Sequence, residues 1–199
     1  MYLLMIFIGL FACNPMRKMT DKERDLIFSG RQNVPFRVLQ TDNVDDSLFL
    51  REKSLNVENI ESFVKDKNWQ HFIERLKLTM DIESGVGIAA IQVGIQRNIF
   101  LFMRLDKVDR PIEVAINPRI VNHPEGFICF KNDGCLSIPD MSGDTKRYEW
   151  VDVEYYNEKG DFVKERLSGY SRTGDFTGVI FQHEFDHLQG ILYIDKIYE

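Results

Sequence analysis

From Gly178 to Gly190 the chain reads Gly-Val-Ile-Phe-Gln-His-Glu-Phe-Asp-His-Leu-Gln-Gly, which contains the pattern H-E-x-x-H. Its histidines, His183 and His187, are four residues apart, so on an α-helix both imidazoles would project from one face toward one metal ion. Glu184 directly follows the first histidine, where a general base is needed if a metal ion activates the attacking water. No proline interrupts the segment, and Gly190 is suited to end a helix. The sequence therefore predicts a helix that carries two metal ligands.

The predicted helix also has an apolar flank. Phe176, Val179 and Ile180 share the face of the two histidines and are expected to wall a pocket beside the metal. Because H-E-x-x-H also arises by chance, the alternative interpretation is an ordinary amphipathic helix with two histidines. Two histidines and a water leave a tetrahedral site one protein ligand short, so another part of the chain has to supply the third.

A cysteine is the candidate for the third ligand. Cys135 lies within Asp133–Ser137 (Asp-Gly-Cys-Leu-Ser), where Gly134 gives the backbone freedom to turn the thiol inward. A thiolate is a good partner for two imidazoles on Zn²⁺ or Fe²⁺, and a fourth position stays open for water. A free buried cysteine is the competing interpretation.

Composition is that of a soluble globular protein. The 199 residues suffice for one domain with its own core, and hydrophobic residues make up 44%. A net charge of −6 and the absence of a basic stripe argue against nucleic-acid binding. The three cysteines form no C-x-x-C pair and no even set, so the sequence indicates no disulfide framework.

The N-terminus contains an apolar run, Tyr2–Ala12, followed by Cys13 and polar chain. The run is too short to span a bilayer but matches the apolar region of a signal peptide, and its end resembles a bacterial lipobox with a lipidated cysteine. No lysine-rich segment precedes it, and the alternative is a buried strand or helix. We predict a signal or lipoprotein-like segment and tether over residues 1–33, a folded domain over residues 34–199, and attachment to the bacterial cell envelope through Cys13.

Periodicity outlines the folded domain. Apolar residues from about Asn56 to Ile82 recur at three- and four-residue steps, which predicts one long amphipathic helix. Residues 98–104 and 112–116 are predicted strands, the second ending at Asn117 and the proline after it. Residues 149–167 alternate with period two around a turn and predict a hairpin.

Between the long helix and the first strand, Gly85–Gln92 crowds small residues around one polar side chain, Gln92. Glycines let a second backbone come close, and a carboxamide in a tight apolar setting usually has an assigned partner. The alternative interpretation is a helix-to-strand turn with a capping glutamine.

Three segments, in this order, resemble the three motifs of the peptide deformylases. G-x-G-x-A-A-x-Q matches Gly85–Gln92 at every fixed position, and Q-H-E-x-D-H-L matches Gln182–Leu188. E-G-C-L-S matches Asp133–Ser137, except that aspartate replaces the glutamate. The resemblance spans roughly residues 34–195, and the three motifs together are highly specific. It implies an α+β fold in which antiparallel strands surround a central metal-binding helix and the helix of residues 56–82 packs outside.

The resemblance also implies an activity and a cofactor. Cys135, His183 and His187 would hold one divalent ion per chain, Fe²⁺ in most family members, with Zn²⁺, Ni²⁺ or Co²⁺ as substitutes. The folded domain would be catalytic and would hydrolyse N-formylmethionyl peptides to formate and a free amino terminus. Glu184 would take the proton of the attacking water and pass it to the leaving amine.

The substrate is expected to bind as an added strand beside Gly85–Gln92. Gln92 and the backbone N–H of Leu136 would stabilise the developing oxyanion. The residues implied to contact the peptide are Val86, Gly87, Gly134, Phe176 and Val179. A monomer without a nucleic-acid partner is expected. The resemblance implies a cytoplasmic location, whereas the apolar N-terminal run favours the cell envelope.

Three departures from the family pattern bear on the substrate. Asp133 is shorter than glutamate, an extra segment at Tyr170–Asp175 could reshape the pocket rim, and only nine residues follow Gly190. The long C-terminal helix that some relatives use at the ribosome is therefore not expected. We hypothesise that the metal chemistry is intact and that the physiological substrate differs from that of a housekeeping deformylase.

Two other functions share part of this pattern. A zincin-type peptidase is disfavoured because zincins take their third ligand downstream of the helix, whereas Cys135 lies upstream. A non-catalytic or substrate-diverged envelope lipoprotein that binds formyl peptides or metal on the same scaffold is the second. Glu184 and Gln92, both intact, argue against it.

Overall fold

The computed structural model describes residues 19–198, so the apolar run Tyr2–Ala12 and Cys13 lie outside the described residues. In chain order the elements are α1 (Asp21–Ile27), α2 (Val44–Leu50), α3 (Ile60–Lys65), α4 (Lys67–Ile82), β1 (Gly87–Ala89), the 3₁₀ turn η1 (Ala90–Val93), β2 (Ile99–Met103), β3 (Ile112–Asn122), β4 (Ile128–Cys135), β5 (Ile138–Arg147), β6 (Trp150–Tyr156), β7 (Phe162–Ser168), α5 (Thr177–Leu188) and the 3₁₀ turn η2 (Tyr193–Lys196). The expected α+β class with antiparallel strands is confirmed.

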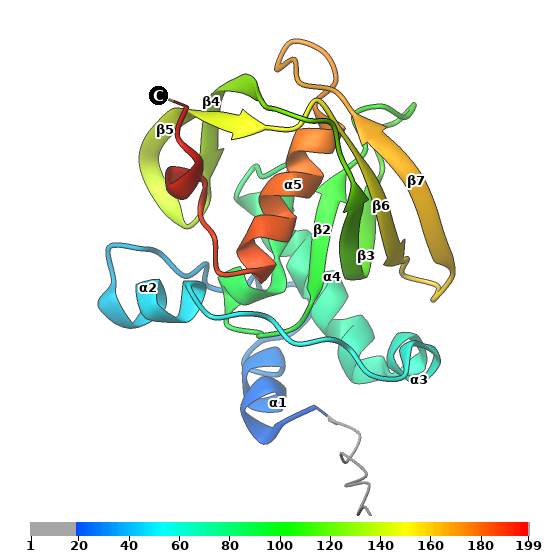
Figure 1. Ribbon diagram of the computed structural model, residues 1–199. Coiled ribbons are helices and arrows are strands. Elements are labelled where there is room, and N and C mark those ends of the chain that lie inside the picture. The colour runs from blue at the N-terminus through cyan, green and yellow to red at the C-terminus, as the bar shows by residue number, and fades with distance from the viewer. Residues whose placement is uncertain (1–18, 199) are drawn as a thin grey trace, which may run out of the picture.

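The strands form two antiparallel sheets. Five of them pair in the order β1-β2-β3-β6-β7, whereas β4 and β5 pair with each other. Helix α5 lies between the two sheets and packs against β1, β2 and β7 of the larger one (Figure 1). The interior position of α5 explains why 11 of its 12 residues are buried.

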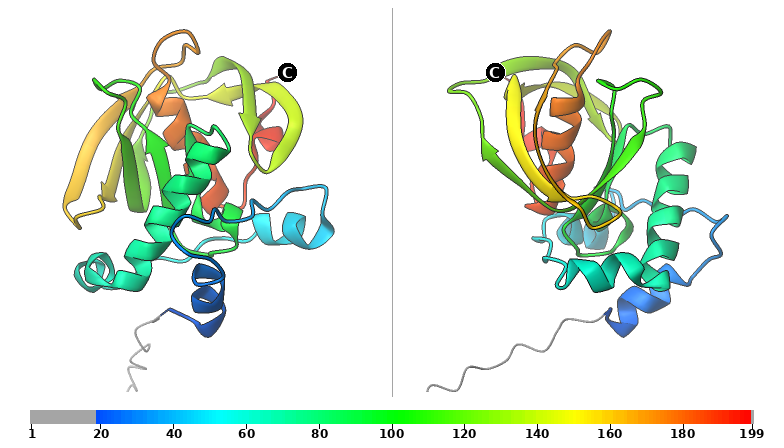
Figure 2. Two further views of the ribbon diagram at one scale, coloured as in Figure 1. Left: turned by 180° about the vertical axis from the view of Figure 1, so that it is seen from behind. Right: turned by 90° about the vertical axis from the view of Figure 1, so that its right-hand side faces the viewer.

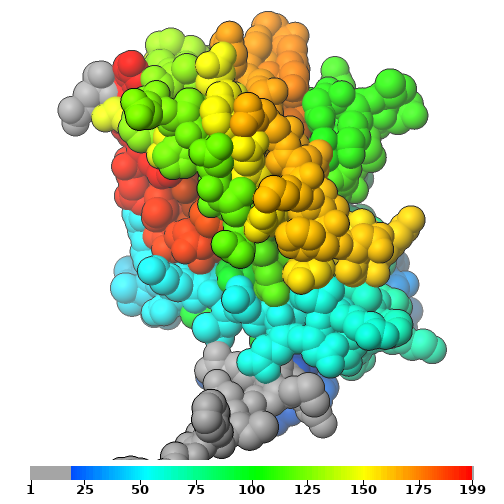
Figure 3. All heavy atoms as spheres, turned by 45° about the vertical axis from the view of Figure 1, so that its right-hand side comes forward, coloured from blue at the N-terminus to red at the C-terminus, as the bar shows by residue number. Residues whose placement is uncertain are grey.

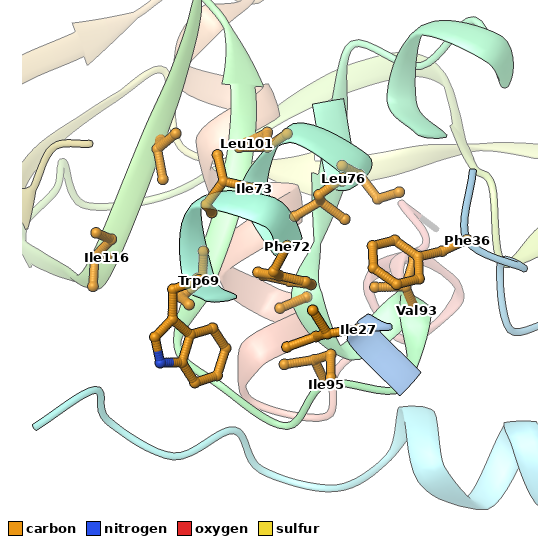
Figure 4. Close-up of a cluster of buried hydrophobic side chains, with 14 of the residues drawn as sticks. Ile27, Phe36, Trp69, Phe72, Ile73, Leu76, Val93, Ile95, Leu101 and Ile116 are labelled. Atoms are coloured by element: carbon orange, nitrogen blue, oxygen red, sulfur yellow. The ribbon is translucent and has the colours of Figure 1, made fainter. Parts of the chain in front are cut away.

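The larger sheet is covered on its other face by α4 (Figure 2). In α4 the buried apolar residues recur at helical spacing, as Trp69, Phe72, Ile73, Leu76 and Met80. They pack with Leu101 of β2 and Val114 of β3 in one cluster, part of which is drawn in Figure 4. Burying each such side chain contributes roughly 1.5–3 kcal/mol, so this cluster stabilises the packing of α4 on the larger sheet.

The face toward α5 is built from aromatic rings. Phe181 of α5 packs edge-on against Phe100 and Phe102 of β2, with ring centroids 4.9 and 5.3 Å apart. The ring centroid of Tyr155, in β6, lies 5.9 Å from that of Phe181. Edge-to-face contacts of this kind stabilise the packing of α5 against the larger sheet.

The helix expected from Asn56 to Ile82 is two helices, which corrects that prediction. The chain turns at Asp66, which ends α3 in an extended conformation (φ −76°, ψ 118°) and caps α4 by accepting a hydrogen bond from Asn68 N at 2.8 Å. The aspartate side chain bonds a backbone amide at the start of α4 that would otherwise be unpaired, and it thereby stabilises a new helix start at this point. The apolar spacing continues from α3 into α4, which is why the apolar pattern did not reveal the break.

The strand expected to end at Asn117 continues as β3 to Asn122, so that boundary was wrong. Asn117 adopts a positive φ of 51°, and the pairing of β3 with β6 shifts there. Its carboxamide bonds both the N–H and the C=O of Val57. Pro118 falls in the irregularity, where the missing N–H breaks no regular pair. The predicted hairpin of residues 149–167 is confirmed as β6 and β7.

Part of the segment expected to be a tether is packed structure. Helix α1 covers Asp21–Ile27, Ile27 is fully buried in the core, and Glu23 pairs with Arg97. The apolar side chain and the ion pair both hold α1 to the domain. Within residues 19–198 no helix combines the length and the apolar character needed to cross a membrane.

Candidate active site

Three potential metal ligands from two distant segments meet between the sheets. Cys135 ends β4, whereas His183 and His187 lie one turn apart on α5. One ligand atom from each lies within 4.8 Å of the other two, and Cys135 Sγ is 3.2 Å from His187 Nε2. In the part of the chain that the structure describes, no other three His, Cys, Asp or Glu side chains converge in this way.

This donor set fits a divalent transition metal. One thiolate and two imidazoles leave the fourth position of a tetrahedral site open, as in catalytic zinc sites. Gln92 Nε2 and Ser137 N approach Cys135 Sγ at 3.6 and 3.4 Å as hydrogen-bond donors. These two contacts orient the sulfur toward the two histidines.

Asp133 orients His183 through a hydrogen bond to its imidazole ring. Its Oδ1 lies 3.1 Å from His183 Nδ1. Because a carboxylate can only accept, Nδ1 carries the proton, and Nε2 is left as the ligand atom. Burial opposes ionisation of Asp133, but the charges of His183 and Arg147 outweigh it and hold its pKa well below the usual range.

Arg147 extends this arrangement into a buried network. Its guanidinium lies 2.7 Å from Asp133 Oδ2 and 2.6 Å from Asp186 Oδ2, and Thr145 donates to Asp133 at 2.8 Å. Lys196 in η2 reaches the other oxygen of Asp186 at 2.8 Å. The network therefore links β4, β5, α5 and the end of the described chain around one imidazole.

Glu184 is, like Asp133, a buried carboxylate that lines the cleft. It is 4% exposed, and its Oε2 has no hydrogen-bond partner. Burial raises its pKa to about 7, partly offset by the charge of His183. Gly87 provides the room for this carboxylate, because a Cβ at Gly87 would overlap Glu184 Oε1. A carboxyl group that titrates near neutral pH can both accept and return a proton.

The sequence offered two interpretations of Gln92, a carboxamide with an assigned partner and a capping glutamine, and the structure shows both. Its Oε1 accepts from Ala89 N at 2.8 Å and thereby caps η1, while its Nε2 points toward Cys135 and donates to Ser137 Oγ at 3.1 Å. It is 2% exposed. Because the carbonyl end is fixed by the backbone, the N–H end is held toward the ligand cluster.

A cleft of about 420 Å³ opens onto these groups. All but one of the residues singled out from the sequence line it: Val86, Gly87, Gln92, Gly134, Cys135, Leu136, Phe176, Val179, His183 and Glu184. His187 lies behind the wall and is 1% exposed. The rim carries Glu83, Asp140 and Arg172, and Phe130 adds a ring to the apolar wall.

Sequence reasoning missed Arg147 and Phe130. Strand β5 was not predicted because residues 139–142 are exposed on both of its faces and show no period of two. Thr145 and Arg147, at the end of that strand, are both buried. Their spacing of two residues was the signal in the sequence that they could share one face of a strand.

Comparison with known proteins gives one answer throughout. Residues 38–199 match the polypeptide deformylase family. The peptide deformylase of Thermotoga maritima is 41% identical over 133 residues, which cover 66% of this chain and 74% of that protein. That of Borreliella burgdorferi is 38% identical over 147 residues, covering 73% and 80%.

Solved structures agree. The crystal structure of the Thermotoga maritima peptide deformylase matches with a TM-score of 0.69 at 32% identity, covering 83% of this chain and 99% of that one. A peptide deformylase from Synechococcus elongatus in complex with actinonin also matches with a TM-score of 0.69, at 28% identity, covering 83% and 80%.

Proposed function

The chain belongs to the peptide deformylase family, and on that premise we propose which of its residues carry the reaction. It is an enzyme that hydrolyses the formamide bond of N-formylmethionyl peptides to give formate and a free amino terminus. We assign Cys135, His183 and His187 to one divalent ion, with Fe²⁺ as the native metal. When bound, such an ion polarises the formyl carbonyl and lowers the pKa of water. The convergence of the three donors beside Glu184 carries this assignment.

Glu184 is assigned as the general base and acid. It accepts the proton of the attacking water and passes it to the nitrogen of the departing amine, which requires a carboxyl group that changes charge near neutral pH. Its pKa of about 7 matches that need.

Gln92 and Leu136 are assigned to the oxyanion. As the formyl carbon becomes tetrahedral, its oxygen gains negative charge, and donors fixed in advance stabilise that charge by about 3 kcal/mol each. Gln92 Nε2 is held in place by the bond from Ala89 N to its own carbonyl. The backbone N–H of Leu136 lies directly after Cys135 in the cleft.

The peptide would run along β1, the edge strand of the larger sheet, with Val86 and Gly87 at the cleft. An edge strand presents unpaired N–H and C=O groups to an extended ligand. With the formyl group at Cys135, His183 and Glu184, the first side chain enters the neighbouring apolar part of the cleft, formed by Phe130, Phe176, Val179 and Ile180.

The test is formate release from an N-formyl-Met tripeptide by anaerobically purified protein and by Glu184→Gln. Removing the base is expected to lower kcat by about 10²–10⁴ while one metal ion per chain is retained. Glu154→Gln, which removes a carboxylate from β6 outside the cleft, serves as the control. Turnover unchanged in Glu184→Gln would refute the assigned role. Elemental analysis of the same protein identifies the native metal, and zinc without iron would contradict the Fe²⁺ assignment.

We also propose that the protein is a monomer attached to the cell envelope through a lipidated Cys13. The support is the apolar run before Cys13 and the lipobox-like residues there. Cell fractionation of the full chain and of Cys13→Ser tests this, since only the first should follow the membrane fraction. Cytosolic recovery of both, together with complementation of a strain that lacks its main deformylase, would contradict both the envelope location and a diverged substrate. The alternative of a non-catalytic binding protein is not favoured by the relatives.

A further inference from the structure

The loop between β7 and α5 is a built part of the cleft rim. Ser171 N donates to Asp175 O at 3.0 Å and Gly174 N to Ser171 O at 2.9 Å, which closes the loop on itself. Asp175 Oδ1 accepts from both the backbone N–H and the hydroxyl of Thr177, at 2.8 and 2.7 Å. The loop is thus fixed to the first residue of the helix that carries the histidines. In Figure 3 it is the orange surface at the top of the molecule, beside the segments of β4 and β5 in lime and yellow.

Arg172 reaches from this loop to the apolar end of the cleft. Its Cζ lies 5.3 Å from the ring centre of Phe130 and 5.6 Å from that of Phe176. Its Nε donates to the carbonyl of Lys131 at 3.3 Å, and its Nη2 donates to the carbonyl of Asn132. Two rings and two carbonyls hold the guanidinium in place, although the residue is exposed. Nη1 forms no hydrogen bond with the described residues, so it is a positioned donor without an acceptor.

The charges around the cleft limit what this donor can bind. Arg172 is the one Arg or Lys among the cleft residues, whereas Glu83 and Asp140 are acidic and exposed at the same rim. A carboxylate entering the cleft would meet these two like charges. An uncharged oxygen acceptor would avoid that repulsion and still accept from Nη1.

We propose that Arg172 recognises an uncharged oxygen at the end of the first side chain, so that the enzyme deformylates peptides beginning with N-formylmethionine sulfoxide. This inference rests on the proposed placement of that side chain against Phe130 and Phe176. A sulfoxide oxygen is a strong acceptor, and the thioether of methionine is a weak one. The reaction at the formyl group is the same for both substrates. Arg172 decides only which first side chain is bound.

The experiment compares three tripeptides that differ only at the first side chain: N-formyl norleucine, methionine and methionine sulfoxide, each followed by Ala-Ser. The quantity measured is kcat/KM for the sulfoxide divided by kcat/KM for norleucine, which has no acceptor. Arg172→Leu is expected to lower this ratio about tenfold, the effect of losing one hydrogen bond to a charged donor. Arg172→Lys is expected to recover part of it, because the charge is kept while the planar donor is lost.

Arg166→Leu is the matched control. Arg166 of β7 also lies over an aromatic ring, with its Cζ 3.6 Å from the ring centre of Trp150. It pairs with Asp152 of β6, and none of these residues lines the cleft. Its loss removes the same charge and the same kind of stacking, so the ratio should stay at the wild-type value.

The outcomes separate recognition from support of the loop. If Arg172 only held the loop, Arg172→Leu would lower kcat/KM for all three peptides alike, and the unchanged ratio would overturn the proposal. A wild-type enzyme that turns over methionine and norleucine peptides but not the sulfoxide would overturn it as well. No turnover of any formyl peptide by metal-loaded wild-type protein would instead count against the residue roles proposed above.

Discussion

Two buried arginines, Arg147 and Arg104, each bind several carboxylates, but the two sets of carboxylates differ in how far they are buried. Arg147, 1% exposed, pairs with Asp133 and Asp186, whose side chains are 5% and 8% exposed. Arg104, 2% exposed, lies just after β2 and bonds three carboxylates with side-chain exposures between 24% and 32%: Asp106, Glu113 and Glu165. Both arginines are fully engaged, but only the partners of Arg147 are cut off from water.

The difference shows what burial adds to an ion pair. Asp133 also contacts His183, so the network of Arg147 ends on a proposed metal ligand. The network of Arg104 includes Tyr155 and Lys107, and through Asp106 it reaches Thr177 at the start of α5, six residues before His183. A carboxylate that cannot be reached by water depends entirely on its protein partners, whereas a half-exposed one can be solvated when a partner is removed.

The largest effect should come from Arg147→Met. The variant leaves Asp133 and Asp186 buried with fewer partners, and breaking a buried pair in this way destabilises proteins by about 3–5 kcal/mol. Urea denaturation of the metal-free protein measures it. A loss below about 1 kcal/mol would mean that Lys196 and Thr145 suffice for these carboxylates.

A smaller effect, confined to the metal, is expected from Asp133→Asn. The amide keeps the size of the side chain but loses the charge that holds His183 in its tautomer, and such changes typically lower metal affinity by about 10–100-fold. Competition with a chromophoric chelator for Zn²⁺ or Co²⁺ gives the affinity. Asp133→Glu restores the charge and should recover most of the loss; equal affinities for all three proteins would show that Asp133 does not orient the histidine.

Arg104→Met should destabilise the protein by only about 1–2 kcal/mol, because its carboxylates keep access to water. The metal affinity should equal that of wild type, since the described hydrogen bonds from this network to α5 are those between Asp106 and Thr177, six residues before His183. The same urea and chelator measurements apply. A metal-affinity loss as large as that of Asp133→Asn would remove the distinction between the two networks.

The smallest effect concerns pH and Glu113. Burial opposes its ionisation, but bonds from Lys107 and Tyr155 and the charge of Arg104 outweigh this and lower its pKa below the usual 4.5. Its contribution is therefore complete above pH 4.5 and is lost as the pH falls through the lower folded value. In Glu113→Gln the free energy of unfolding should fall less steeply with acid below pH 4.5 than in wild type. A parallel decline of both proteins would show that Glu113 contributes nothing to acid sensitivity.

Local pattern predicted the pieces with strong periodicity. The hairpin of residues 149–167 followed from alternation, because each of its strands buries one face more than the other. The strand near residues 98–104 followed from a continuous apolar run, because β2 is buried on both faces. The break at Asp66 and the continuation of β3 through Pro118 did not follow, since both depend on side-chain bonds to groups elsewhere, Asn68 N and the backbone of Val57. The sheet of β4 and β5 was missed because residues 139–142 of β5 are exposed on both faces and show no period of two.

The sequence by itself determined the chemistry: the spacing of two histidines around Glu184, a cysteine in a glycine-rich turn, and three motifs that identify the family. Those features are local, because helix period and residue type decide them. Only the tertiary structure decided that Cys135 lies 3.2 Å from His187, that Arg147 supports Asp133, that Gly87 makes room for Glu184, and that Arg172 closes the rim. Each of these joins segments far apart in the chain, and the packing of α5 between two sheets brings them together.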